Sequence, residues 1–132
     1  MRVGIVGTRT FDDYELMKET LEAFNDIDEI ISGGANGADT LANNYSKEFL
    51  GKEATVFEAE WDNLEAEPCK IKYRKDGSPF NVLAGFNRNS KIVENSDKII
   101  AFWDSKSTGT LDTITKAYNK DIDVLVIHYD IK

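Results

Sequence analysis

The stretch IISGGANGAD, residues 30–39, places three glycines and an aspartate directly after two isoleucines. Gly33 and Gly34 end an apolar segment of strand length, and Asp39 lies at the start of a segment with helical periodicity. Glycines in a strand-to-helix turn leave backbone N–H groups open to a ligand, so this turn can hold a phosphate. The same residues could also serve the turn alone, with Asp39 stabilising the first helical turn.

Apolar runs of strand length alternate with helical segments along the chain. Strands are predicted over residues 2–7, 29–34, 54–60, 98–104 and 124–130. The apolar helix positions between them are Tyr14, Met17, Leu21 and Phe24, then Ala38, Leu41, Ala42, Tyr45 and Phe49, and finally Leu111, Ile114 and Tyr118. Parallel neighbouring strands need crossover connections, so this order predicts a single α/β domain over residues 1–132, with a mainly parallel sheet and helices on both faces.

A polar insert at about residues 62–83 interrupts this alternation. It contains the sequence CKIKYRKDGSPF, in which four basic residues precede an Asp76-Gly77 turn. We expect a hairpin or flap before the third main helix. Its basic residues form either a solvated hairpin or a clamp for ligand phosphates; they are Lys70, Lys72, Arg74 and Lys75.

Two further strand-to-helix turns carry small and polar residues. Gly7, Thr8 and Arg9 follow the first strand, and residues 105–110 (SKSTGT) follow the fourth. The carboxyl ends of parallel strands share one edge of a sheet, and open α/β sheets bind ligands there. Three such turns at one edge favour a site for an anionic, nucleotide-sized ligand over the alternative that these residues only form the turns.

Composition limits the partners that we expect. With 16 basic and 24 acidic residues the net charge is -8, which argues against bulk nucleic acid and anionic membranes as partners. The chain has one cysteine, Cys69, and one histidine, His128, which argues against disulfides and a zinc site, and we expect no metal and no cofactor. The N-terminus is not signal-like and no apolar run is long enough to span a membrane, so we expect a cytoplasmic protein.

Five motifs in order resemble one family: VGTRTF (6–11), SGGANGAD (32–39), AEWD (59–62), AGFNRN (84–89) and AFWDSKSTGT (101–110). They resemble the YspA-like branch of the SLOG superfamily, whose relatives include the lonely-guy nucleotide phosphoribohydrolases and the DNA-processing protein DprA. The resemblance covers nearly the whole chain except the insert. It implies a Rossmann-like domain with five strands in the order 3-2-1-4-5 that binds nucleotides or nucleotide-derived ligands.

The motifs and turns together define the predicted ligand site. Its residues are Gly7, Thr8, Arg9, Ser32, Gly33, Gly34, Ala35, Gly37, Asp39, Trp61, Arg88, Asn89, Trp103, Asp104, Ser107, Thr108, Gly109 and Thr110. For Trp103 a role in the core is an equal alternative, and Trp61 could instead pack under the insert.

The sequence departs from the signature P-G-G-x-G-T-x-x-E of the lonely-guy enzymes. Gly109 and Thr110 match it, but residues 105–107 replace Pro-Gly-Gly and Thr113 stands where the glutamate would be. Asp112 is one residue away, which rotates its side chain by about 100° around a helix. Arg88 matches the family's arginine, and an arginine beside a lost acid favours phosphate binding over bond cleavage. No catalytic residue is assigned.

Three functions remain open at this point. The first is a binder of a nucleotide or nucleotide-derived small molecule that carries out no catalysis. The second is an N-glycosidase that resembles the phosphoribohydrolases. The third is a sensor or sponge of a nucleotide second messenger in bacterial or phage antiviral conflict, such as the cyclic ADP-ribose type of signal that SLOG domains recognise. A homodimer or higher homo-oligomer is also left open.

Overall fold

Five parallel strands form the central sheet of the computed structural model, which describes residues 1–129. They are β1 (Arg2–Gly7), β2 (Glu29–Ser32), β3 (Thr55–Val56), β6 (Lys98–Trp103) and β7 (Asp123–His128), in the order β3-β2-β1-β6-β7. This order confirms the predicted 3-2-1-4-5 arrangement, because the two intervening strands of the chain pair elsewhere. Asp130, the last residue of the predicted fifth strand, lies outside the described residues.

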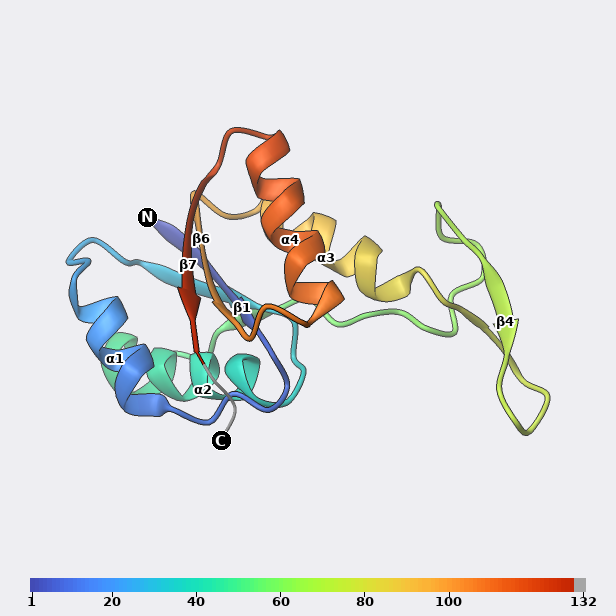
Figure 1. Cartoon of the computed structure of the whole chain (residues 1–132), viewed down its shortest axis with the longest axis horizontal. Helices are drawn as coiled ribbons and strands as arrows, with labels where there is room; N and C mark the ends of the chain where they lie inside the picture. Colours follow the sequence, from blue (N-terminus) through green and yellow to red (C-terminus); the bar gives the residue numbers. More distant parts are fainter. Residues whose placement is uncertain (130–132) are drawn as a thin grey trace.

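Helices cover both faces of the sheet (Figure 1). They are α1 (Tyr14–Glu22), α2 (Ala38–Tyr45), α3 (Ala84–Glu94) and α4 (Thr108–Asn119), and a short π-helix, η1 (Ser46–Leu50), continues α2. Asp13 caps α1 by accepting a hydrogen bond from the Leu16 N–H at 3.0 Å, and Ser107 caps α4 by accepting one from the Thr110 N–H at 3.3 Å.

Alternation along the strands divides the core into two clusters. In β6, Ile100 and Phe102 face the cluster that holds Met17 and Leu21 of α1. Ile99 and Ala101 of the same strand face the opposite cluster, which includes Ile92 and Val93 of α3 and Ala117 of α4. Successive residues of a strand point to opposite faces of the sheet. When helices cover both faces, all of these residues are buried, and the sequence of the strand is continuously apolar. The predicted helices on both faces are thereby confirmed.

Some element boundaries differ from the predictions. The second strand ends at Ser32, two residues before Gly34, and the third spans only Thr55–Val56 of the seven residues predicted. The backbone pairing between β2 and β3 covers only Ile31 with Thr55 and Ser32 with Val56, and an apolar pattern alone does not mark where such pairing ends.

The buried face of α4 also differs from the expected one. Leu111 and Tyr118 are 43% and 77% exposed, whereas Thr110, Thr113 and Ala117 are buried. Ile114, the third residue predicted for this face, is partly buried and packs against the core cluster on that side of the sheet. The apolar period of this helix therefore predicted its existence correctly and its buried face only in part.

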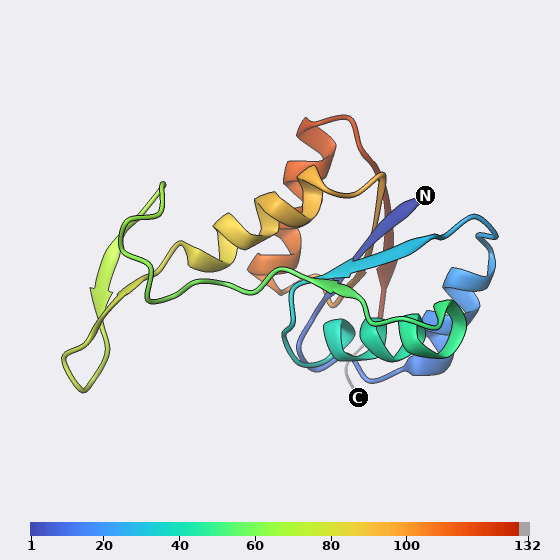
Figure 2. The ribbon, with the colours of Figure 1, turned by 180° about the vertical axis from the view of Figure 1, so that it is seen from behind.

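The insert forms an arm that projects from the body (Figures 1 and 2). We define the arm as residues 62–83; it contains the antiparallel strands β4 (Ile71–Tyr73) and β5 (Pro79–Asn81). The predicted turn at Asp76 and Gly77 is confirmed, with Gly77 at a φ of +88° and its N–H donating to the Arg74 carbonyl at 2.9 Å. Within residues 1–129, no helix combines the length and the apolar character required to span a bilayer.

Candidate functional site

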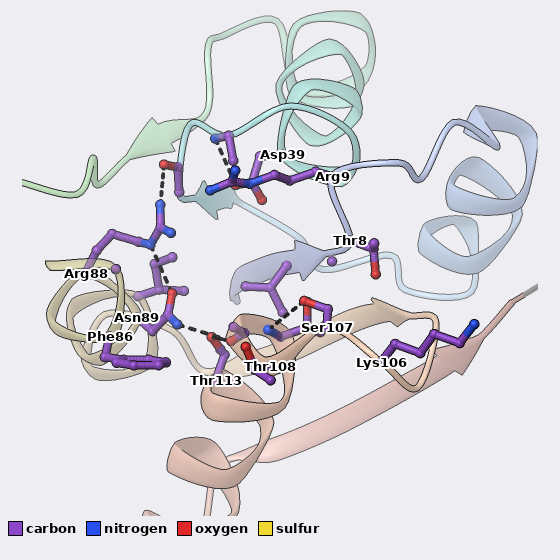
Figure 3. A pocket seen from close by; sticks show the side chains of 18 of the residues that line it. Thr8, Arg9, Asp39, Phe86, Arg88, Asn89, Lys106, Ser107, Thr108 and Thr113 are labelled. Atoms are coloured by element: carbon purple, nitrogen blue, oxygen red, sulfur yellow. Dashed lines mark hydrogen bonds between the residues drawn. The ribbon is translucent and has the colours of Figure 1, made fainter. Parts of the chain in front are cut away.

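A cavity of about 540 Å³ opens at the carboxyl edge of β1, β2 and β6 (Figure 3). Its volume falls in the range of about 300–1,000 Å³ that is usual for small-molecule sites. Three strand-to-helix turns border it, and α3 and the start of α4 form the side opposite the turns after β1 and β2. The structure thus brings the three predicted turns together at one edge of the sheet.

Most of the predicted site residues line this cavity. They are Gly7, Thr8, Arg9, Gly33, Ala35, Asp39, Trp61, Arg88, Asn89, Ser107, Thr108, Gly109 and Thr110.

Three predicted residues of the glycine-rich turn do not line the cavity. Ser32 is fully buried at the end of β2, and Gly34 borders a shallower neighbouring hollow of about 360 Å³. Gly34 and Gly37 adopt φ values of +73° and +76°, which L side chains rarely adopt. A Cβ on Gly37 would also collide with the backbone carbonyl of Arg9. These residues shape the turn that holds the cavity residues.

Two predicted residues at the end of β6, Trp103 and Asp104, also lie outside the cavity. The Trp103 indole N–H donates to the Ser107 carbonyl at 3.0 Å. Asp104 accepts hydrogen bonds from the N–H groups of Lys106 at 2.9 Å and Ser107 at 2.8 Å, and these bonds lower the pKa of its carboxyl group. Both side chains are engaged in fixing the turn before α4.

Arg88 and Asn89 link the turns to each other. Arg88 donates from Nη1 to the Gly33 carbonyl at 2.7 Å and from Nε to Asn89 Oδ1 at 2.9 Å. Asn89 in turn donates from Nδ2 to the Gly109 carbonyl and to Asp112 Oδ2, both at 3.2 Å. A chain of hydrogen bonds therefore runs from the turn after β2, through α3, to the first turn of α4 (Figure 3).

Asp39 is a buried carboxylate at the cavity, with 8% of its surface exposed. Its Oδ2 accepts a hydrogen bond from the Ala35 N–H at 3.0 Å. Burial raises its pKa to about 6, while the Ala35 N–H and the charges of Arg88 and Arg9 act in the opposite direction. Burial likewise lowers the pKa of Arg88, and Asp39 counteracts that effect.

The cavity lining is positively charged although the chain is acidic. Its charged residues are Arg9, Arg88 and Lys106 against the single carboxylate of Asp39, whereas the whole chain has a net charge of -8. Arg9 and Lys106 are exposed and Arg88 is half-buried, so their charges reach the open part of the cavity. This arrangement attracts an anion.

Thr113 lines the cavity at the place where the enzymatic signature has its glutamate. Its hydroxyl donates to the Gly109 carbonyl at 3.4 Å. The neighbouring carboxylate, Asp112, lies outside the lining and forms an ion pair with Lys116 at 2.8 Å. Among the described residues, Asp39 is the only carboxylate at the cavity.

The basic residues of the arm do not reach the cavity. None of Lys70, Lys72, Arg74 and Lys75 belongs to its lining. Arg74 instead donates within the arm, to Asp62 Oδ1 at 2.9 Å and to the Pro79 carbonyl at 3.1 Å. In this structure the four basic residues are exposed on the hairpin and lie outside the cavity lining.

Several lining residues were not predicted from the sequence: Val6, Val82, Gly85, Phe86, Ile92 and Lys106. Val6, Gly85, Phe86 and Lys106 lie inside three of the motifs, so their position beside predicted site residues was a usable signal. Val82 and Ile92 lie outside every motif, and as apolar residues they are expected in the core.

No family model matches this sequence, and a search of curated proteins finds no match either. Among solved structures, the chain is similar to DNA processing protein A from Helicobacter pylori, whose single-stranded DNA binding mode that structure describes. The two share 19% sequence identity with a TM-score of 0.63, over 100% of this chain and 67% of that chain. The likeness shows the fold alone, a Rossmann-like α/β domain. The assignment to the SLOG superfamily and to its YspA-like branch stays a prediction.

This likeness corrects one expectation. The negative net charge was taken to argue against bulk nucleic acid as a partner, but DNA processing protein A, which has a similar fold, binds single-stranded DNA. Net charge sums over the whole surface, whereas binding depends on local potential, and here the cavity lining is positive. The exclusion drawn from net charge is therefore wrong.

Proposed function

We propose that this protein binds a nucleotide or nucleotide-derived small molecule and holds its phosphate at the glycine-rich turn. The observation that carries the proposal is the positive cavity where three strand-to-helix turns meet. Backbone N–H groups at such turns and two arginines are the donors that phosphate groups require. Arg88 is already oriented by Gly33 and Asn89, so little side-chain entropy is lost when it binds a ligand.

The proposed function does not include catalysis. Hydrolysis of a base–ribose bond needs a group that can transfer a proton or stabilise the developing charge at the ribose. Thr113 cannot supply a carboxylate, and Asp112 is held by Lys116 and Asn89. Asp39 accepts the Ala35 N–H and supports the phosphate-binding turn. These contacts favour a binder over the N-glycosidase alternative.

The experiment is incubation of the protein with AMP, ADP and ADP-ribose, followed by mass spectrometry of the small molecules. We expect each nucleotide to be recovered intact, and calorimetry to show binding of at least one of them. Release of adenine or ribose 5-phosphate above a protein-free control would establish the enzyme instead. Absence of binding to every phosphorylated nucleotide would contradict the proposal. If the nucleotide stays intact and an equimolar amount of protein binds nearly all of it, the proposal extends to a sensor or sponge.

A second candidate is binding of single-stranded DNA, favoured by the similarity in fold to DNA processing protein A. The cavity continues into the neighbouring hollow, and the two share Arg9, Gly33 and Arg88 in their linings. A single strand could place successive phosphates along these residues. Titration of the protein with oligonucleotides of increasing length separates the candidates: affinity that rises with length supports DNA, and affinity that is highest for the mononucleotide supports the small molecule.

A further inference from the structure

Two large aromatic side chains at the cavity remain exposed. Trp61 is 38% exposed and Phe86 is 39% exposed, and both line the cavity. The other exposed aromatics with large side chains, Phe49 of η1, Tyr73 of the arm and Tyr118 of α4, do not line it. Exposure of large apolar side chains inside a concave site is a feature of ligand-binding surfaces.

Contacts from two other parts of the chain position these rings. The Trp61 ring lies against the start of α3, where a Cβ placed on Gly85 would be 3.4 Å from Trp61 Cη2. On the side of α4, Lys116 donates from Nζ to the Phe86 carbonyl at 2.5 Å, and the same ammonium group lies 5.8 Å from the centre of the Phe86 ring. Lys116 is itself held by Asp112. The first turn of α3 is thus fixed to α4 beside the cavity.

Phe86 and the glycine-rich turn lie on different sides of the site, and Trp61 lines both the cavity and the hollow beside that turn. Phe86 lies on α3 below Asn89, and Arg9 and Asp39 lie across the cavity from it (Figure 3).

Arg88 lies on α3 with Phe86 and reaches the glycine-rich turn through its bond to Gly33. Trp61 and Arg88 both adjoin Gly85, since a Cβ on Gly85 would lie 3.4 Å from Trp61 Cη2 and 3.9 Å from Arg88 Nη2. A nucleotide joins an anionic phosphate to a flat aromatic base, so a base could contact these rings while its phosphate contacts Arg88 and the turn.

We propose that Trp61 and Phe86 form an aromatic wall that binds the base of the ligand and makes the site selective for phosphates that carry a base. The inference rests on the proposed function and adds its substrate class. Stacking of a base on an aromatic side chain tolerates any base, because every base has a π-face. The wall therefore favours ligands that carry a base over ligands that lack one, and it does not distinguish one base from another.

The test compares AMP with ribose 5-phosphate, which lacks the base, in the parent and in Trp61→Ala and Phe86→Ala. We expect each substitution to lower the affinity for AMP by about 5- to 150-fold, the range that corresponds to loss of one stacked aromatic contact. The affinity for ribose 5-phosphate, measured directly or by competition, should change by less than about twofold. Tyr118→Ala removes an aromatic that is 77% exposed and outside the cavity, and should change neither affinity.

The outcomes separate this inference from the proposed function. If neither of these compounds binds the parent, and ADP and ADP-ribose do not bind it either, the proposed function fails. If both bind the parent equally, and the two alanine variants bind AMP as the parent does, the aromatic wall is wrong while the phosphate site stands. Trp61→Phe keeps an aromatic ring and should retain most of the preference for AMP. Loss of that preference in Trp61→Phe, with circular dichroism unchanged, would also contradict a stacking role.

Discussion

Arg88 and Gly33 are 55 residues apart in the sequence and are joined by a hydrogen bond of 2.7 Å from the guanidinium to the backbone carbonyl. The bond fixes α3 against the turn after β2. Nε of Arg88 is bonded to Asn89, and Nη2 has no partner among residues 1–129. The arginine is thus anchored through two nitrogens and presents the third at the edge of the cavity.

The two adjacent glycines of this turn should respond differently to substitution. A Cβ on Gly33 would lie 2.9 Å from Arg88 Cζ, the end of a flexible side chain, whereas Gly34 has a φ of +73° and its Cβ would lie 2.8 Å from Val56 Cγ1. We expect Gly33→Ala to fold, displace Arg88 and weaken AMP binding about tenfold or more. Gly34→Ala should lower the free energy of unfolding by about 1–2 kcal/mol.

Urea denaturation and calorimetry of the two variants check this difference. Parental affinity in Gly33→Ala would show that the position of Arg88 does not matter for the ligand. Equal losses of stability in both variants would show that the glycines serve the same purpose in the turn.

Asp39 should make the stability of the protein depend on pH. Its pKa is raised from the ordinary value of 3.8 to about 6, mainly by burial, so the folded state binds the proton more tightly than the unfolded state. The stabilisation is fully present below pH 3.8 and is lost as the pH rises through 6. The difference between the two values corresponds to about 3 kcal/mol.

Asp39→Asn removes this titration and retains an oxygen that can accept the Ala35 N–H. We expect the variant to gain stability relative to the parent as the pH rises from 4 to 7, measured by urea unfolding at several pH values. All other titrating groups are shared, so the difference between the curves reports Asp39. Parallel curves for parent and variant would contradict a raised pKa.

The arm should not contribute to phosphate binding. Lys70, Lys72 and Lys75 lie outside the cavity, whereas Lys106 lines it. We expect the combined change of the three arm lysines to glutamine to leave AMP affinity and its salt dependence unchanged. Lys106→Gln should weaken binding several-fold and flatten the salt dependence, because a screened charge contact is lost. If the affinity of the arm variant for AMP depended less on salt concentration than that of the parent, the arm lysines would contact the ligand and this prediction would be wrong.

The sequence predicted the convergence of the three turns because the alternation of strands and helices implies a parallel sheet, in which the carboxyl ends of the strands share one edge. The order of the strands was predicted from the family resemblance and not from the alternation. The apolar pattern predicted the buried face of α4 only in part, because Thr110 and Thr113 pack inward and the apolar Leu111 points out. That the basic residues of the arm lie away from the cavity was also not predictable, since the direction of a hairpin depends on its two connections. Phe86 was not predicted because its exposure depends on where the start of α3 lies.

Sequence patterns also could not separate residues that line the site from those that support it. Trp103 and Asp104 belong to the same motif as Ser107 and Thr108, yet the first two fix the turn and the last two line the cavity. Neighbouring residues in a tight turn point in different directions. The backbone dihedral angles decide these directions, and they cannot be derived from the residue types alone.

The most direct test of the phosphate site is the ratio of the affinities for AMP and adenosine, measured by calorimetry in the parent and in Arg88→Gln. If Arg88 and the glycine-rich turn hold a phosphate, the parent binds AMP at least about tenfold more tightly than adenosine, because only AMP forms charge-assisted hydrogen bonds. In Arg88→Gln the ratio falls toward one while the affinity for adenosine is unchanged. Equal binding of AMP and adenosine by the parent, or an equal loss of both in the variant, would contradict the phosphate site.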